Sequence, residues 1–157
     1  MGAGMKARRT RWLAVLALVA YVAILIKLVV FKAIPTIRVG HLRLRFAGPH
    51  TGPANLVPFK TIAPQIIGRG NHLVNMVNLF GNTLPFMPVG FLARFVFRSF
   101  SWQKALILGV GTGLCFELLE LIFHVGIFDV DDVIMNAAGV MLGYGVSVMF
   151  KPRSTRA

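Results

Sequence analysis

Four long apolar runs, each close to the length of a membrane span, constrain this chain more than any other feature of its sequence. The first run covers about residues 12–32 and extends about 30 Å as a helix, which matches a bilayer core. Further runs cover about residues 71–97, 102–123 and 131–150. Hydrophobic residues make up 56% of the chain and charged residues 14%, whereas soluble domains have about 45–50% and about 25%. We therefore expect an all-α membrane protein, a compact bundle of four transmembrane helices in a single domain, 1–157.

The segment between the first two runs, residues 35–70, has a different character, because prolines, glycines and basic residues are frequent in it. Within it, Ile37–Phe46 alternates apolar and basic residues, which indicates an amphipathic strand on a surface. Asn55–Ile62 combines aliphatic residues, a proline and an aromatic residue with one base, as interfacial segments do. We therefore expect an irregular, partly interfacial first outer loop.

Details within the runs predict how the helices are built and packed. The first run is longer than the ~7–15 apolar residues of a signal peptide and no A-x-A site follows it, so we expect an uncleaved helix. Pro85, Pro88 and Gly90 interrupt the second run and predict a kink. Small residues four positions apart let membrane helices approach closely. Such pairs are Gly109/Gly113 in the third run and Gly139/Gly143 in the fourth.

The basic residues predict the orientation. Seventeen Lys and Arg against five Asp and Glu give 17 − 5 = +12, but the bases flank the apolar runs, so nucleic acid is not an expected partner. With the N-terminus inside, the cytoplasmic side carries Lys6, Arg8, Arg9, Arg11, Arg94, Arg98, Lys104, Lys151, Arg153 and Arg156. The opposite side carries Lys32, Arg38, Arg43, Arg45, Lys60 and Arg69. The positive-inside rule then predicts a multi-pass protein of the bacterial cytoplasmic membrane with both termini in the cytoplasm.

A stripe of asparagines marks the second run. Asn71, Asn75, Asn78 and Asn82 are spaced four, three and four apart, so on a helix they share an arc of about 60°. Single amides in membranes often bond to neighbouring helices and so hold the packing together. A stripe of four beside kinking prolines favours a hydrated cavity.

Acidic residues gather around the loop between the third and fourth runs. Glu117 and Glu120 lie three apart near the end of the third run, and acids at membrane depth are usually functional. Alternatively, these two glutamates lie at the interface and pair with loop bases. In the block 129–136, Asp129 or Asp131 suits an N-cap, but capping does not require three aspartates. The block lacks the order of a calcium loop. Oxygen ligation of a hard cation is the less favoured alternative, and we expect no metal.

Other reactive side chains give weak signals. Cys115 is the one cysteine of the chain and lies in an apolar run, where a small buried thiol is expected. None of the four histidines shows metal-ligand spacing, and no nucleophile arrangement is recognisable. We therefore expect no cofactor.

Four segments in this order resemble the VanZ-like family. They are Asn55-Leu56-Val57-Pro58-Phe59-Lys60-Thr61-Ile62, then Asn78-Leu79-Phe80-Gly81-Asn82 with Pro85-Phe86-Met87-Pro88-Val89-Gly90-Phe91, then Glu117-Leu118-Leu119-Glu120, then Phe128-Asp129-Val130-Asp131-Asp132-Val133-Ile134-Met135-Asn136 with Gly139 and Gly143-Tyr144. The resemblance covers roughly residues 55–145, and the acidic block with its asparagine is its most specific part. It implies a small multi-pass bacterial membrane protein, in a family whose founding member is associated with low-level teicoplanin resistance.

The resemblance also implies motif positions at Asn55, Lys60, Asn78, Asn82, Glu117, Asp129, Asp131, Asp132 and Asn136. Two positions depart from the family pattern, since Glu120 stands where Gln is usual and Ile127 where Arg or Ser is common. We expect these residues, Glu120 included, to form an outward-facing polar pocket. Its ligand would be a lipid-linked or lipophilic glycopeptide or a cell-wall precursor.

The basic outer loop suggests a second part of that site. Arg38, Arg43, Arg45 and Lys60 could bind the phosphate of an anionic lipid head group by charge-assisted hydrogen bonds. The alternative is an intramembrane enzyme that uses Glu117 with Glu120, or Glu117 with an aspartate of the block, as general acid and base on a lipid-linked phosphate or acyl substrate. A small transporter would require a homo-oligomer to form a path, and it is the least favoured of the three functions.

Overall fold

The computed structural model describes residues 2–30, 36–39, 42–45, 52–97 and 99–150. The helices are α1 (Gly2–Leu25), continued by the π-helical turn η1 (Ile26–Val30), α2 (Ile62–Ile66), α3 (His72–Thr83), the 3₁₀ turn η2 (Leu84–Phe86), α4 (Met87–Val96), α5 (Trp102–Ile122) and α6 (Val130–Met149). Two short strands, β1 (Thr36–Val39) and β2 (Leu42–Arg45), precede α2. The predicted charges at Lys32, Arg98, Lys151, Arg153 and Arg156 lie outside the described residues.

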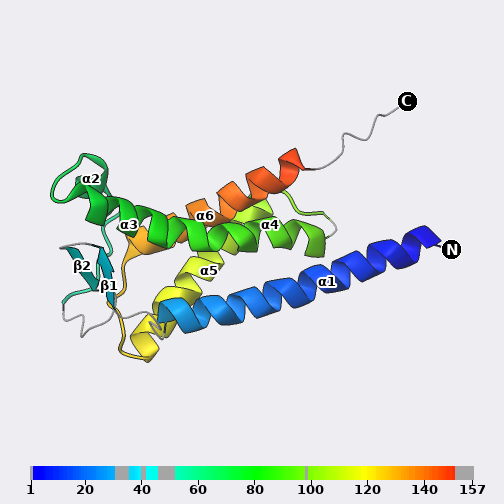
Figure 1. Ribbon diagram of the computed structural model, residues 1–157, viewed down its shortest axis with the longest axis horizontal. Coiled ribbons are helices and arrows are strands. Elements are labelled where there is room, and N and C mark those ends of the chain that lie inside the picture. The colour runs from blue at the N-terminus through cyan, green and yellow to red at the C-terminus, as the bar shows by residue number, and fades with distance from the viewer. Residues whose placement is uncertain (1, 31–35, 40–41, 46–51, 98, 151–157) are drawn as a thin grey trace.

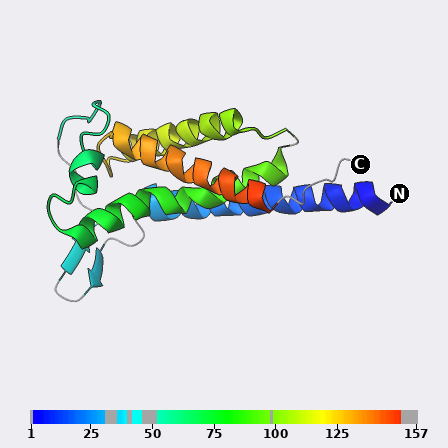
Figure 2. The same ribbon diagram turned by 90° about the horizontal axis from the view of Figure 1, so that it is seen from above.

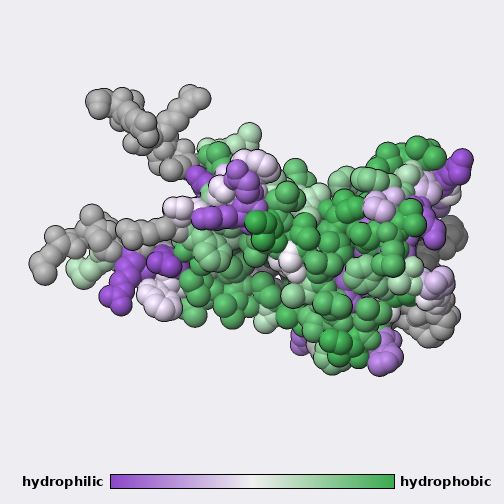
Figure 3. Space-filling view, turned by 180° about the vertical axis from the view of Figure 1, so that it is seen from behind, coloured by the Kyte–Doolittle hydropathy of each residue, from purple (hydrophilic) through white to green (hydrophobic). Residues whose placement is uncertain are grey.

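The predicted helical membrane architecture is confirmed. Within the described residues, four helical stretches are long and apolar enough to cross a membrane, and they cover Arg8–Val30, His72–Val96, Trp102–Ile122 and Val130–Met149. Large apolar side chains on them point outward, and Figure 3 shows them as a broad hydrophobic band between two more polar ends. Such a band fits the hydrocarbon layer, so the chain is a multi-pass membrane protein in contact with lipid.

The predicted strand within Ile37–Phe46 is instead a hairpin. β1 and β2 pair antiparallel, with Thr36 opposite Arg45 and Arg38 opposite Arg43. A single strand on a surface leaves its backbone N–H and C=O groups without partners, whereas pairing within the segment satisfies one edge of each strand. The alternation of apolar and basic residues therefore indicated strand structure correctly and missed its division into two paired strands.

The predicted kink in the second span is present. The helix tightens into the 3₁₀ turn η2 at Pro85, where the N–H of Met87 donates to the carbonyl of Leu84, and then continues as α4. The hydroxyl of Tyr21, on α1, donates to the carbonyl oxygen of Pro85 at 2.8 Å. A neighbouring helix thus supplies a polar partner at the break, as a membrane environment requires.

Helix α6 is the centre of the bundle, since it contacts α3, α4 and α5, while α1 packs on α4 (Figures 1 and 2). Both predicted glycine pairs lie in these contacts. A methyl group at Gly109 or Gly113 would lie 2.8 Å from Cα of Ala137 or 3.0 Å from Cα of Val133 on α6. On α6 itself, a methyl at Gly139 or Gly143 would overlap the carbonyl groups of Thr83 and Met87.

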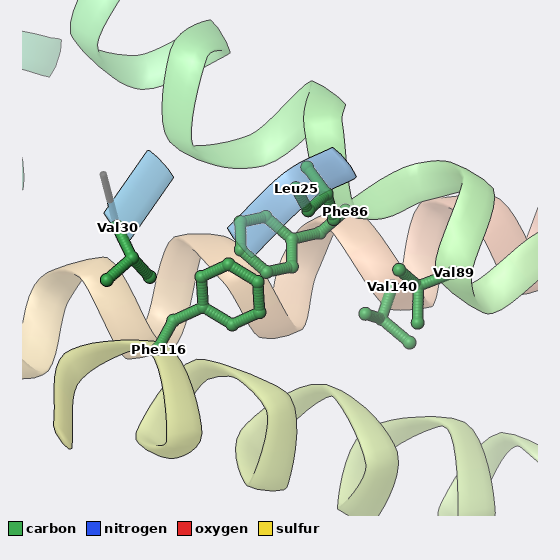
Figure 4. Packing of buried hydrophobic residues seen from close by; sticks show 6 residues of the cluster. All are labelled: Leu25, Val30, Phe86, Val89, Phe116 and Val140. Atoms are coloured by element: carbon green, nitrogen blue, oxygen red, sulfur yellow. The ribbon is translucent and has the colours of Figure 1, made fainter. Parts of the chain in front are cut away.

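The buried core lies where the end of α1 meets η2, α5 and α6. Its fully packed residues are Leu25, Val30, Phe86, Val89, Phe116 and Val140 (Figure 4). The rings of Phe86 and Phe116 meet edge to face, with centroids 5.1 Å apart, which is a favoured aromatic geometry. Because Phe86 belongs to η2, this contact also fixes the kink against α5.

Close backbone contact at Gly143 predicts a large difference between two neighbouring substitutions. We expect Gly143→Ala to lower the free energy of unfolding by about 1–3 kcal/mol, because the added methyl must push α4 away from α6. Gly145→Ala, on the same helix with open space around it, should change stability by less than about 0.5 kcal/mol. Thermal unfolding in detergent, followed by circular dichroism, measures both, and equal melting temperatures would contradict the described contact.

Candidate functional site

All five acidic residues of the chain lie at one end of the bundle, which we call the acidic end. Glu117 and Glu120 belong to the last turns of α5, and Asp129, Asp131 and Asp132 lie at the start of α6. Figure 1 shows that α2 and the hairpin are at this end, whereas α1 begins and α6 ends at the opposite end. The predicted convergence of the acidic residues is therefore a property of the fold.

A loop that precedes α2 is hydrogen-bonded to the start of α6. The backbone of Asn55 pairs with that of Asp129 in a parallel bridge, in which the N–H of Asn55 donates to the carbonyl of Phe128 at 2.8 Å and the N–H of Val130 donates to the carbonyl of Asn55 at 3.0 Å. The Asn55 side chain adds a bond, since its Nδ2 donates to Oδ1 of Asp129 at 2.8 Å. The same oxygen accepts the N–H of Asp131 at 2.9 Å, so Asp129 is the N-cap of α6.

Asp131 is fully buried, and its carboxylate holds the next part of this loop. Oδ1 accepts the N–H of Phe59 at 2.5 Å. Oδ2 accepts the N–H of Thr61 at 2.7 Å, its hydroxyl at 2.7 Å and the N–H of Ile62 at 3.2 Å. Both oxygens are thereby engaged with the protein, because four donors satisfy a buried carboxylate that would otherwise be costly.

The other acids connect the neighbouring helices. Asp132 accepts a hydrogen bond from Nδ2 of Asn82 on α3 at 2.7 Å. Glu117, also buried, accepts the N–H of Asp129 at 2.8 Å. Glu120 packs against Gly126, where an added methyl would overlap its carboxylate. The acidic residues thus join α3, α5, α6 and the loop at a single junction.

A cavity of about 330 Å³ opens at this junction. Three acidic residues line it, and they are Glu120, Asp129 and Asp132. The rest of its lining comes from Pro53, Asn55, Thr61, Gly126, Ile127 and Phe128. Pro53, Thr61, Gly126 and Phe128 were not predicted from the sequence as site residues, although Thr61 and Phe128 lie inside the motif segments that carry the family resemblance.

Several predicted site residues lie elsewhere. Lys60 is exposed beside Thr61, Asn136 is buried one helical turn beyond Asp132, and the half-buried Asn78 has no hydrogen-bond partner for its side chain among the described residues. None of these three lines the cavity. Arg38 lies in β1, and Arg43 and Arg45 lie in β2, at the acidic end, with only their backbone described.

The four asparagines of the stripe differ in their hydrogen-bond partners in the structure. Asn71 is the N-cap of α3, since its Oδ1 accepts the N–H groups of Leu73 and Val74. Asn75 donates from Nδ2 to the carbonyls of Gln65 and Arg69. Asn82 alone among the four asparagines reaches an acid in the described residues, and none of the four lines the cavity described above.

The chemistry of the cavity is that of a hydrogen-bond acceptor. Carboxylate oxygens accept bonds from ammonium, hydroxyl and amide donors, and charge-assisted bonds of this type are the stronger ones. Among the described residues, no three His, Cys, Asp or Glu side chains are arranged to hold a metal ion. Acidic side chains gathered in this way can accept hydrogen bonds from several donors at once.

These features define the class, which is a four-span membrane protein with a carboxylate-lined cavity closed on one side by an anchored loop. The family model described as VanZ/LLP1 matches residues 18–151, and the chain belongs to this family. It is also similar to Protein VanZ of Enterococcus faecium, with 29% identity over 133 residues, which is 83% of this chain and 72% of the relative. No solved structure matches the chain.

The four bonds to Asp131 predict that this residue contributes strongly to stability. We expect Asp131→Ala to lower the free energy of unfolding by about 3 kcal/mol, because three N–H groups and a hydroxyl lose their buried acceptor. Asn78→Ala, a half-buried site without a described bond, should cost less than about 1 kcal/mol. Chemical denaturation in micelles compares the two, and similar losses would show that the Asp131 bonds contribute little.

Proposed function

We propose that this protein binds a lipid-linked or lipophilic glycopeptide or cell-wall ligand in the cavity at its acidic end, and that this binding contributes to glycopeptide resistance of the teicoplanin type. The observation that carries the proposal is the cavity itself, in which three carboxylates converge at one end of a membrane bundle. Glycopeptides and sugar-bearing lipids present amide, hydroxyl and amine donors, and an acyl chain stays in the adjacent lipid. Membership of the VanZ/LLP1 family supports the link to resistance.

The hydrogen bonds narrow the set of residues that would contact such a ligand. Asp129 and Asp132 each use Oδ1 for their described bonds, so the second oxygen of each is the candidate acceptor for a ligand. Asp131 is instead a structural residue, because both of its oxygens bind the loop. We therefore place ligand recognition on Asp129, Asp132 and the neighbouring Glu120, with Asn55 and Asn82 orienting the two aspartates.

The basic residues of the outer segment supply the second half of the proposed site. β1 and β2, which carry Arg38, Arg43 and Arg45, lie at the same end as the cavity (Figure 1). Lys60 is exposed on the loop that lines the cavity. A ligand with a phosphate and several donors would match a basic rim and an acidic interior.

We further propose that the protein lies in the bacterial cytoplasmic membrane as a single domain, with the acidic end outside and both termini in the cytoplasm. The excess of bases at the terminal end supports this orientation. In a Cys115→Ala background, a membrane-impermeant maleimide should label Lys60→Cys in intact cells. It should label Gln103→Cys, at the exposed start of α5, after permeabilisation only. The reverse pattern would place the cavity in the cytoplasm.

Binding of teicoplanin to the purified protein in nanodiscs tests the proposed ligand. We expect Asp132→Asn to raise the dissociation constant about tenfold or more, because a charge-assisted hydrogen bond of about 1.5–3 kcal/mol is lost. Lys104→Gln, at the opposite end of the bundle, is the control and should bind as the unchanged protein does. Expression of each variant in a glycopeptide-susceptible host should give the same order of resistance. Equal affinity of all three proteins would refute the cavity as the binding site.

An intramembrane acid–base enzyme is the second candidate, and one observation favours it. Glu120 and Asp132 line the same cavity, as a general acid and base acting on one substrate must. Glu117, a predicted member of that pair, is buried against the backbone of Asp129 and does not line the cavity. Release of phosphate or fatty acid from envelope lipids by the purified protein would support the enzyme, because a binding protein turns nothing over.

A further inference from the structure

A group of large apolar side chains is exposed on the loop that borders the cavity. Leu56, Val57 and Phe59 have 70%, 59% and 59% of their surface exposed, and Ile66 and Ile67 at the end of α2 are exposed to a similar degree. We call these five residues the apolar tip. They belong to the segment that precedes the membrane-spanning α3, at the acidic end of the bundle (Figure 1).

The protein holds this tip in place from both sides. At its start, Asp131 binds the backbone of Phe59, Thr61 and Ile62, and Phe59 is fixed with a φ of 66°, a conformation that is uncommon for a residue with a side chain. At its end, the Asn75 side chain donates to two backbone carbonyls of residues 65 and 69. A loop anchored in this way presents its apolar side chains outward as a fixed feature of the fold.

Two exposed bases lie within and next to the apolar tip. Lys60 follows Phe59 directly, and Arg69 lies two residues after Ile67. Apolar side chains interleaved with bases are typical of segments that lie in the interface of a bilayer, where the bases attract anionic head groups. The chain spans a membrane, so the leaflet at the acidic end is the surface adjacent to the tip.

We infer that residues 56–69 form a membrane-surface anchor, in which the apolar tip enters the head-group region of the leaflet at the acidic end and Lys60 and Arg69 bind phosphate of anionic phospholipids. Asp131 is the positioning residue of this anchor. The anchor would hold the mouth of the cavity at the level of the lipid head groups. The anchor requires no ligand, so its test does not depend on whether the proposed ligand binds the cavity.

A tryptophan reporter at position 59 tests the anchor. In a Trp12→Phe/Trp102→Phe background, Phe59→Trp is placed in vesicles of phosphatidylcholine and phosphatidylglycerol, with either lipid brominated on its acyl chain. We expect blue-shifted emission, strong quenching by brominated lipid and weak quenching by aqueous iodide. At equal mole fraction, brominated phosphatidylglycerol should quench more than brominated phosphatidylcholine, and Lys60→Gln should remove that excess.

Two further reporters calibrate the measurement. Leu114→Trp, on the exposed face of α5, should be quenched equally by both brominated lipids, and Ala54→Trp, exposed on the loop outside the tip, should be quenched by iodide. Asp131→Asn and the milder Thr61→Val should raise iodide quenching at position 59 and leave the reporter at position 114 unchanged, which shows that the bundle is still folded.

The anchor is refuted if iodide quenches the reporter at position 59 as fully as the one at position 54 while brominated lipid does not. It is also refuted if the reporter is shielded from both quenchers, because another protein surface, such as a second copy of the chain, then covers the tip. Unchanged quenching in Thr61→Val and Asp131→Asn would remove the positioning role of Asp131.

Discussion

The acidic end depends on one buried carboxylate. Asp131, in the first turn of α6, accepts hydrogen bonds from three backbone N–H groups and one hydroxyl group of the loop. These donors lie about 70 residues earlier in the sequence. A buried carboxylate without donors would be strongly unfavourable, so the loop and the helix stabilise each other. The cavity takes part of its wall from this loop, through Asn55 and Thr61. The proposed binding site and the proposed membrane anchor therefore share a single support.

Away from the acidic end, the helices pack through close contacts between their backbones. Lipid tails are as apolar as the side chains of the helices, so burial from water contributes little to association inside the bilayer. The glycines of α5 and α6 replace that contribution with close contact, since the carbonyls of Thr83 and Met87 lie where a side chain of α6 would otherwise be. The same contacts hold η2, whose Phe86 packs on Phe116, and thereby keep the kink of the second span at a fixed position.

The sequence predicted most of the fold, because membrane spans, proline kinks and glycine pairs depend on local composition and spacing. It also predicted that the acids converge, since the topology brings the end of α5 and the start of α6 together. It could not separate Asp131 from Asp132. Successive residues on a helix point about 100° apart, so one of these two faces the loop and the other faces α3 and the cavity. Likewise, only the folded loop shows that Asn75 binds its carbonyls.

The order of biosynthesis determines when the contact between Asp131 and the loop can form. The chain is made from its N-terminus, and Thr61 precedes the carboxylate that holds it by 70 residues. The loop and three of the spans are therefore synthesised before its acceptor exists. Insertion of α6 both completes the glycine contacts and brings the loop into position. A nascent chain arrested before α6 would be embedded in lipid and would lack the cavity at the acidic end.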